Sequence, residues 1–278
     1  MHSPLILLKN GRDVPPLFIT HGLGGEVAEL DELTGQLGSG RPIYGLQWRG
    51  LDGLEKPHDS FDGMAQYFAD AIDKIWPDGP LLLAGLSIGG LPMLEAARVL
   101  LGRGRHVALL VLMDTYPHPK YWPRSSQIAV TLNRMQRKAG AISQMPLREA
   151  FPFAARVLGK FWGRVLARLK GLEIIPTDDT SAGPALRGLR VAAVRALIQY
   201  QPRFYPRKIT FLSAREKTVF PADPAKIWGG ITDDLEIVAL PCHHVAMIGK
   251  EAKMAADALN LCIENALESR KAHHTETV

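Results

Sequence analysis

The sequence predicts an α/β fold in which a mostly parallel central sheet carries helices on both faces. Short apolar runs alternate along the chain with segments whose apolar residues have helical spacing. The strand candidate Val107–Met113 is apolar throughout, as is typical of strands covered on both faces. The chain has 278 residues, 46% of them hydrophobic and 22% charged, which is ordinary for one globular unit of this class.

The expected strands are apolar runs that end at turn or loop residues. Leu17–Thr20 leads into a glycine-rich stretch, His21–Gly25. Val107–Met113 is the longest apolar run in the chain and is far too short to span a bilayer. The predicted strands are 17–20, 42–46, 81–84, 107–113, 209–212 and 235–240.

The expected helices lie between these strands and after the last of them. The clearest one covers residues 60–76, where Phe61, Met64, Phe68 and Ile72 follow helical spacing and Ser60 is placed to cap the first turn. The predicted helices are 29–37, 60–76, 88–101 and 251–267.

The alternation breaks between residues 121 and 206, where the chain is basic and has few strand candidates. Prolines divide this stretch into several predicted helices. We expect a helical lid insertion at 120–207 between two parts of one core, 1–119 and 208–278, or a second structural layer without a gating role. Residues 120–208 hold 17 Lys or Arg against 4 Asp or Glu, whereas the remainder holds 16 against 24. This region is predicted to be either a solvated helical surface or a docking site for an anionic partner.

The motif Gly85-Leu86-Ser87-Ile88-Gly89 matches the Gly-x-Ser-x-Gly nucleophile elbow of α/β-hydrolases. In this motif the serine sits on a strained strand-to-helix turn, and the glycines let neighbouring elements approach. The motif lies between a predicted strand and a predicted helix, which is the context it requires. A glycine-rich turn without catalysis is the alternative. Ser87 is therefore the candidate nucleophile.

A serine hydroxyl needs a base to remove its proton, usually a histidine held by a carboxylate. Two adjacent histidines, His243 and His244, follow the last predicted strand, and only one of them is expected to reach Ser87. Asp114 directly follows the strand 107–113, while Glu216 and Asp223 follow the next strand and are rivals. An aspartate at a strand end is also a frequent turn cap.

The oxyanion of an acyl intermediate needs two preorganised donors. The backbone N–H of Ile88 is one candidate. The second is expected in the loop after an early strand, and we select the N–H of Leu23. His21, in the same loop, is expected to support the loop and not to act as a base.

Several other kinds of site and compartment are not expected. Two cysteines, Cys242 and Cys262, are too few for a disulfide framework and fit a reducing compartment. Cys242 beside two histidines lacks further ligands at zinc-site spacing, so neither a metal nor a cofactor is predicted. No nucleic-acid-binding motif accompanies the basic region. The N-terminus lacks the pattern of a signal peptide, and we expect a cytoplasmic protein.

A set of specific segments covers nearly the first 120 residues: Pro16–Phe18, His21–Gly25, Arg41–Gln47, Arg49–Gly53, Gly79–Ala97 and Leu109–Pro117. In these segments the chain resembles the thioesterase domains of nonribosomal peptide and polyketide synthases. The resemblance implies a Ser-Asp-His triad in which the acid is Asp114. The family's C-terminal signature, Pro-Gly-Asp-His, is matched by Pro241-Cys242-His243-His244, which places the base at His244. This chain has Cys242 where the family usually has Gly, His243 where it has Asp, and Gly22 where it often has Pro.

The resemblance implies release of an acyl, peptidyl or polyketide chain from a phosphopantetheine thioester through an acyl-enzyme. The implied partner is an acyl or peptidyl carrier protein or coenzyme A. Two alternatives remain, namely an esterase or amidase of the same fold and a non-catalytic interaction module. The acyl chain, hydrolytic or cyclising release, the oligomeric state and the choice between a free-standing enzyme and an excised domain stay open.

Overall fold

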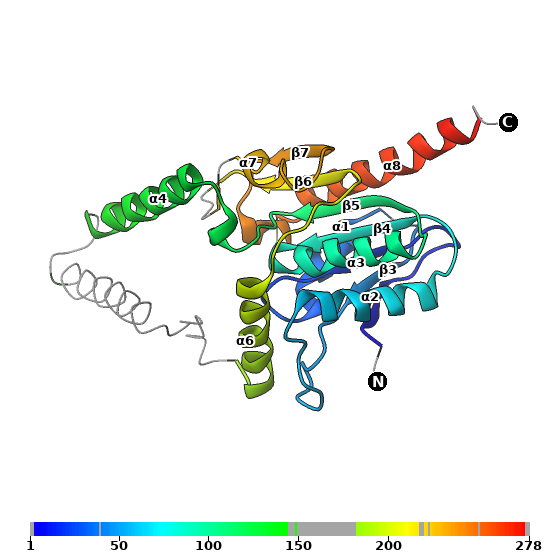
Figure 1. Ribbon diagram of the computed structural model, residues 1–278, viewed down its shortest axis with the longest axis horizontal. Helices are drawn as coiled ribbons and strands as arrows, with labels where there is room; N and C mark the ends of the chain where they lie inside the picture. The colour runs from blue at the N-terminus through cyan, green and yellow to red at the C-terminus, as the bar shows by residue number, and fades with distance from the viewer. Residues whose placement is uncertain are drawn as a thin grey trace.

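A seven-stranded sheet forms the centre of the molecule in a computed structural model of the chain (Figure 1). The structure describes residues 3–38, 40–143, 148, 182–216, 220–221, 223–249 and 251–275. The strand order is β1-β3-β2-β4-β5-β6-β7, and every neighbouring pair is parallel except β1 with β3. The strands are β1 Leu5–Lys9, β2 Leu17–Thr20, β3 Ile43–Leu46, β4 Leu81–Leu86, β5 Val107–Met113, β6 Ile209–Ala214 and β7 Leu235–Leu240. The predicted mostly parallel sheet is confirmed.

The central strands bury both faces because successive side chains point to opposite sides of the sheet. In β4, Leu81 and Leu83 belong to one apolar core, while Leu82, Ala84 and Leu86 belong to the core on the opposite face. An uninterrupted apolar run is therefore typical of a strand whose two faces are both buried.

The edge strand β1 was not predicted from the sequence. It pairs antiparallel with β3, and its middle residues Ile6 and Leu7 are 43% and 48% exposed. A half-buried strand is recognised by alternating apolar and polar residues. Leu5–Lys9 lacks this alternation, because apolar side chains also occupy its exposed positions.

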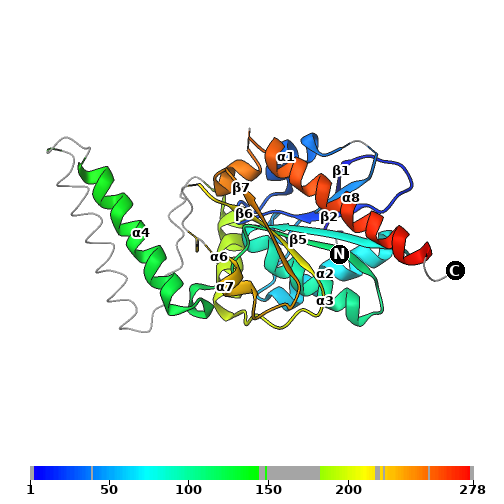
Figure 2. The same cartoon turned by 90° about the horizontal axis from the view of Figure 1, so that it is seen from above.

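Helices cover the two faces of the sheet in separate layers (Figures 1 and 2). Helices α2 and α3 pack on each other and contribute to one core, whereas α1 and α8 pack together and contribute to the other. Ser60 caps α2 by accepting a hydrogen bond from the Gly63 N–H at 3.3 Å, as the sequence predicted. The bounds are α1 Asp31–Gln36, α2 Phe61–Ile75, α3 Gly90–Gly102 and α8 Lys253–Thr275.

Short helical turns divide several connections. The predicted helix 29–37 is split into a 3₁₀ turn and α1, and the predicted helix 88–101 begins with a 3₁₀ turn that contains Ser87. These elements are too short for their periodicity to be read from sequence. The 3₁₀ turns are η1 Val27–Leu30, η2 Ser87–Gly89, η3 Pro119–Tyr121 and η4 His244–Met247, and a further short helix is α7 Ala225–Trp228.

The predicted lid insertion is described only in part. Helix α4, Arg124–Ser143, projects away from the sheet, and α6, Pro184–Gln199, lies against the main body (Figures 1 and 2). Residues 144–147 and 149–181 of the predicted 120–207 insertion lie outside the described residues. Within the described ranges, no helix combines the length and apolar composition needed to cross a bilayer.

A buried carboxylate anchors the end of α6 to the layer that contains α3. Glu95 of α3 is 1% exposed and accepts a hydrogen bond from the Tyr200 hydroxyl at 2.7 Å. Arg203 donates to both Glu95 and the exposed Asp62 of α2. A buried carboxylate is tolerated only when it is paired and hydrogen-bonded, so this network holds the start of the 200–208 segment against α2 and α3.

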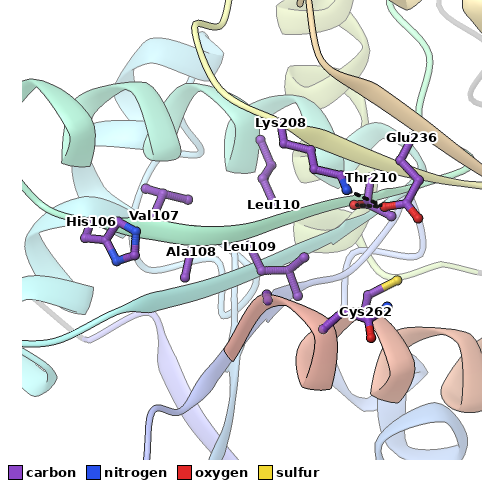
Figure 3. Close-up of a pocket in the computed structure, with 11 residues that line it drawn as sticks. His106, Val107, Ala108, Leu109, Leu110, Lys208, Thr210, Glu236 and Cys262 are labelled. Carbon is purple, nitrogen blue, oxygen red and sulfur yellow. Dashed lines mark hydrogen bonds and ion pairs between the residues drawn. The ribbon is translucent and has the colours of Figure 1, made fainter. Parts of the chain in front are cut away.

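A pocket of about 360 Å³ opens between β5, β6 and α8 (Figure 3). The register of β5 with β6 begins at Val111 with Thr210, so Val107–Leu110 of β5, which line the pocket, have no registered partner in β6. Glu236 bridges its rim, accepting from Thr210 at 3.2 Å and from Lys208 at 3.0 Å. The pocket lies at the amino end of β5, at the opposite end of the strand from Asp114.

Candidate active site

Ser87 lies on a tight turn between β4 and α3. Its φ of +53° is in the left-handed region, which a non-glycine residue rarely adopts. A Cβ at Gly85 would come within 2.5 Å of Gly90, and one at Gly89 would overlap the backbone oxygen of His21. Both motif glycines are therefore required by close backbone approaches, and the serine side chain is directed to the carboxyl edge of the sheet.

His244 joins Ser87 to Asp114 although the three residues come from distant parts of the chain. The Ser87 hydroxyl lies 3.1 Å from His244 Nε2, and His244 Nδ1 lies 2.7 Å from Asp114 Oδ2. The Asp114 side chain is fully buried, and 25% of the His244 side chain is exposed. An ionised carboxylate only accepts hydrogen bonds, so Nδ1 carries the proton and Nε2 is free to accept from the hydroxyl.

Asp114 adopts an unusual backbone conformation directly after β5. Its φ is +46°, and its N–H donates to the Leu212 carbonyl of β6 at 2.8 Å. Asp tolerates the left-handed region better than most residues, because its short polar side chain can hydrogen-bond locally. The turn thus ends the strand and directs the carboxylate toward the edge where His244 lies.

The rival residues lie apart from this chain of hydrogen bonds. His243 Nδ1 is 3.1 Å from the Glu216 carbonyl, and its Nε2 is 3.9 Å from the Glu216 carboxylate. Asp223 accepts from the N–H of Ala225 at 3.1 Å at the start of α7. The structure thus brings Ser87, Asp114 and His244 together and leaves His243, Glu216 and Asp223 in other contacts.

The loop His21–Gly25 follows β2 and lies beside Ser87. His21 is fully buried; its Nδ1–H donates to the Gly22 carbonyl at 2.9 Å, and its Nε2 accepts from the Trp48 N–H at 3.4 Å. Burial lowers the pKa of His21 to about 4, so the ring is neutral near pH 7. Gln47 donates to the Gly25 carbonyl at 2.7 Å. These contacts match the supporting role expected for His21.

Both candidate oxyanion donors lie at turns beside Ser87. Ile88 is in the first turn of η2, where backbone N–H groups have no acceptor inside the helix. Leu23 is 39% exposed at the outer part of the loop. Among the residues that the structure describes, none accepts a hydrogen bond from the Leu23 N–H, while the Gly22 and Gly25 N–H groups are both bonded.

Three side chains beside this arrangement were not predicted from the sequence. The Phe220 ring lies 5.0 Å from the His244 ring and stacks on Tyr116 at 4.9 Å, so it shields one side of the imidazole. Glu29 accepts a hydrogen bond from the Gly22 N–H, and Arg190 of α6 donates to the Gly24 carbonyl at 3.0 Å. None of the three belongs to a recognisable motif, and only the packing of the chain brings them here.

The described part of the chain holds no group of three or more His, Cys, Asp or Glu side chains placed to bind a metal ion. Cys242, which adjoins the two histidines, is 2% exposed, and burial raises the pKa of its thiol. A buried, protonated thiol is a poor metal ligand and a poor nucleophile.

The arrangement has the elements of nucleophilic catalysis by a serine. A hydroxyl is hydrogen-bonded to an imidazole, a buried carboxylate holds the other ring nitrogen, and the loop after β2 lies against the serine. Such a set transfers an acyl group in two steps, through an ester on the serine.

Comparison with known proteins adds three findings. A family model described as "Thioesterase domain" matches residues 15–260. The chain is 28% identical over 271 residues to a dimodular nonribosomal peptide synthase of Bacillus subtilis (strain 168), covering 92% of this chain and 11% of that protein. It is 39% identical over 114 residues to malpinin synthetase of Mortierella alpina, covering 41% of this chain and 2% of that protein.

Solved structures show the same fold. The type II thioesterase YbtT of the yersiniabactin NRPS/PKS pathway superposes with a TM-score of 0.62 at 18% identity, covering 95% of this chain and 99% of that one. The NocB thioesterase domain, in covalent complex with a fluorophosphonate nocardicin G analogue, superposes with a TM-score of 0.61 at 19% identity, covering 91% and 95%. At these identities the likeness establishes the fold alone.

Proposed function

The chain belongs to the thioesterase domain family, and on that premise we propose that it releases an acyl, peptidyl or polyketide chain from a phosphopantetheine thioester through an ester on Ser87. The observation that carries the proposal is the continuous hydrogen-bond chain from Ser87 through His244 to the buried Asp114. Family membership supports the thioester as the bond that is broken, and the hydrogen-bond chain supports Ser87, His244 and Asp114 as the residues proposed to break it.

In the first half-reaction, the Ser87 oxygen attacks the thioester carbonyl while His244 Nε2 takes the hydroxyl proton. The imidazolium that forms is stabilised by the Asp114 carboxylate, which stays ionised. The N–H groups of Leu23 and Ile88 donate to the oxyanion of the tetrahedral intermediate. Collapse of this intermediate breaks the C–S bond, and His244 returns the proton to the departing sulfur.

In the second half-reaction, the same histidine acts again as a base. It takes a proton from water, or from a hydroxyl or amine of the bound chain, as that oxygen or nitrogen attacks the ester on Ser87. The serine leaves with the proton from His244, and the enzyme is restored. The nucleophile decides whether the product is a free acid or a ring.

A thioester is the preferred substrate in this proposal because a thiolate leaves more easily than an alkoxide. We expect kcat/KM for an acyl-pantetheine thioester to exceed that for the matched oxygen ester by about tenfold or more. Steady-state rates on the matched pair measure the ratio, with free thiol and released acid quantified separately. A ratio below one indicates the esterase alternative, and no turnover of either substrate indicates a non-catalytic module.

Asp114 is proposed as the acid that orients His244. Replacing Asp114 by asparagine is expected to lower kcat by about 10³–10⁴-fold, because an amide presents the wrong hydrogen-bonding group to Nδ1. The matched change Glu216→Gln removes the rival carboxylate and is expected to change kcat by less than about twofold. Thioester kinetics on both variants, with circular dichroism to check folding, decide between the two acids. A larger loss in Glu216→Gln contradicts the assignment.

The proposed source of the acyl thioester is an acyl or peptidyl carrier protein or coenzyme A. The strongly basic composition of residues 120–208 supports this, since both sources are anionic. The proposed organisation is one hydrolase core, 1–119 and 208–278, that carries a lid at 120–207. The described helix α6 supports the lid assignment, because it packs directly on the loop beside Ser87.

A further inference from the structure

A carboxylate contacts the loop that is proposed to bind the oxyanion. Glu29 of η1 accepts a hydrogen bond from the Gly22 N–H. A Cβ built on Gly22 would lie 3.3 Å from Glu29 Oε1 and 3.4 Å from Ser87 Cβ. One on Gly24 would overlap Glu29 Oε2. The two carboxylate oxygens therefore contact Gly22 and Gly24, in the same loop that contacts Ser87.

An arginine from α6 meets the same loop. Arg190 donates to the Gly24 carbonyl through Nη2 at 3.0 Å and Nε at 3.4 Å. On the same helix, Leu186 and Leu189 are packed so closely that a Cβ at Gly25 would come within 2.6 Å of Leu186. Arg190 and Glu29 thus contact the same glycine, Gly24, one at its carbonyl and the other at its Cα.

The position of Glu29 creates an electrostatic conflict. A negative charge in contact with this loop opposes the negative charge that develops on the substrate oxygen bound by the loop. Burial raises the pKa of Glu29, whereas the Gly22 N–H, Arg190 and His244 lower it and Glu26 raises it further. Of these groups, Arg190 is the permanently charged cation, so it is the one that offsets the carboxylate in the ionised state.

We propose that Arg190 is a positioning residue that fixes the Gly24 carbonyl and balances the Glu29 charge, so that the oxyanion loop is competent only when α6 packs on it. This inference rests on the proposed thioesterase chemistry. It assigns to the lid helix a direct effect on transition-state stabilisation, distinct from covering the substrate. Arg190 acts through the loop and touches no reacting atom in this proposal.

The single-variant test compares two arginines of α6 on a small acyl-pantetheine thioester. Arg190→Gln is expected to lower kcat about tenfold with KM nearly unchanged, a smaller loss than the 10²–10³ that follows removal of an oxyanion donor itself. Arg187→Gln removes the same charge three residues earlier, from an exposed position, and is expected to behave as wild type. A loss confined to KM, or equal losses in both variants, overturns the proposal.

The double variant separates charge balance from simple tethering. Glu29→Gln keeps an acceptor for the Gly22 N–H but removes the charge, so alone it is expected to change kcat by less than about threefold. Combined with Arg190→Gln, it is expected to restore kcat to within about threefold of wild type. If the double variant is as slow as Arg190→Gln, Arg190 does not act by balancing Glu29.

Two measurements keep this test independent of folding and of the proposed function. Thermal unfolding of each variant identifies a loss of kcat that comes from an unfolded fraction, and a variant that is unfolded at the assay temperature is replaced by Arg190→Met, which keeps the apolar part of the side chain. A wild-type protein that turns over no thioester refutes the proposed function itself. An active wild type with an unaffected Arg190→Gln refutes only the present inference.

Discussion

Replacing His244 by alanine is expected to lower kcat for thioester turnover by about 10⁴-fold or more, because in the described part of the chain His244 is the base bonded to the Ser87 hydroxyl. The Ser87 hydroxyl lies 3.1 Å from His244 Nε2, and the opposite nitrogen is held by a fully buried carboxylate. Both ring nitrogens are hydrogen-bonded, one to Ser87 and the other to Asp114. Removing the ring therefore removes both the base that activates Ser87 and the acid that protonates the departing sulfur.

The neighbouring histidine provides the control for this change. His243→Ala is expected to leave kcat within about twofold of wild type, because His243 pairs with Glu216 and is partly exposed. The two variants differ by one position, have the same composition, and are compared by steady-state kinetics at one pH. A large loss in His243→Ala with an active His244→Ala would reverse the assignment of the base.

Replacing Ser87 by alanine is expected to lower kcat by about 10⁴–10⁶-fold and to abolish covalent capture of the acyl group. The residual rate over water would come from the remaining backbone donors and from substrate binding. Intact-protein mass spectrometry after incubation with a fluorophosphonate or a slow thioester substrate measures the adduct, and peptide mapping locates it.

The His243→Ala protein is the labelled control in this experiment, since its nucleophile and base are both intact. An adduct of equal mass on the Ser87→Ala protein would show that another side chain carries the acyl group. Serine and alanine both carry a Cβ, so the strain of the positive φ at position 87 is the same in the variant. The alanine variant is therefore expected to keep the fold.

Most of the sheet could be predicted because its strands are short apolar runs bounded by loop residues. The predicted bounds of β5 and β7 coincide with those observed, and β4 and β6 extend by two residues beyond their predictions. The edge strand β1 escaped prediction because exposed apolar side chains remove its alternation. The division of 29–37 into η1 and α1 escaped as well, since a single 3₁₀ turn has no periodicity of its own.

The residues of the candidate site also fall into two groups, those with a signal in the sequence and those without one. The roles proposed for Ser87, Asp114 and His244 came from a motif, from strand ends and from family resemblance, and the structure places the three side chains in one hydrogen-bond chain. Glu29 and Arg190 had no such signal. They are separated by most of the chain and meet only because α6 packs across the loop after β2.

Local chemistry in the chain was enough to identify the elbow, since the glycines around Ser87 are needed for a turn formed by five consecutive residues. It was not enough to decide which of two adjacent histidines, or which of three carboxylates, meets the hydroxyl. His244 lies 157 residues from Ser87 and 130 residues from Asp114 along the chain. Contacts over such separations depend on how loops at the carboxyl ends of parallel strands pack against one another. Family resemblance could therefore indicate Asp114 and His244, but only the folded molecule shows that their side chains meet Ser87.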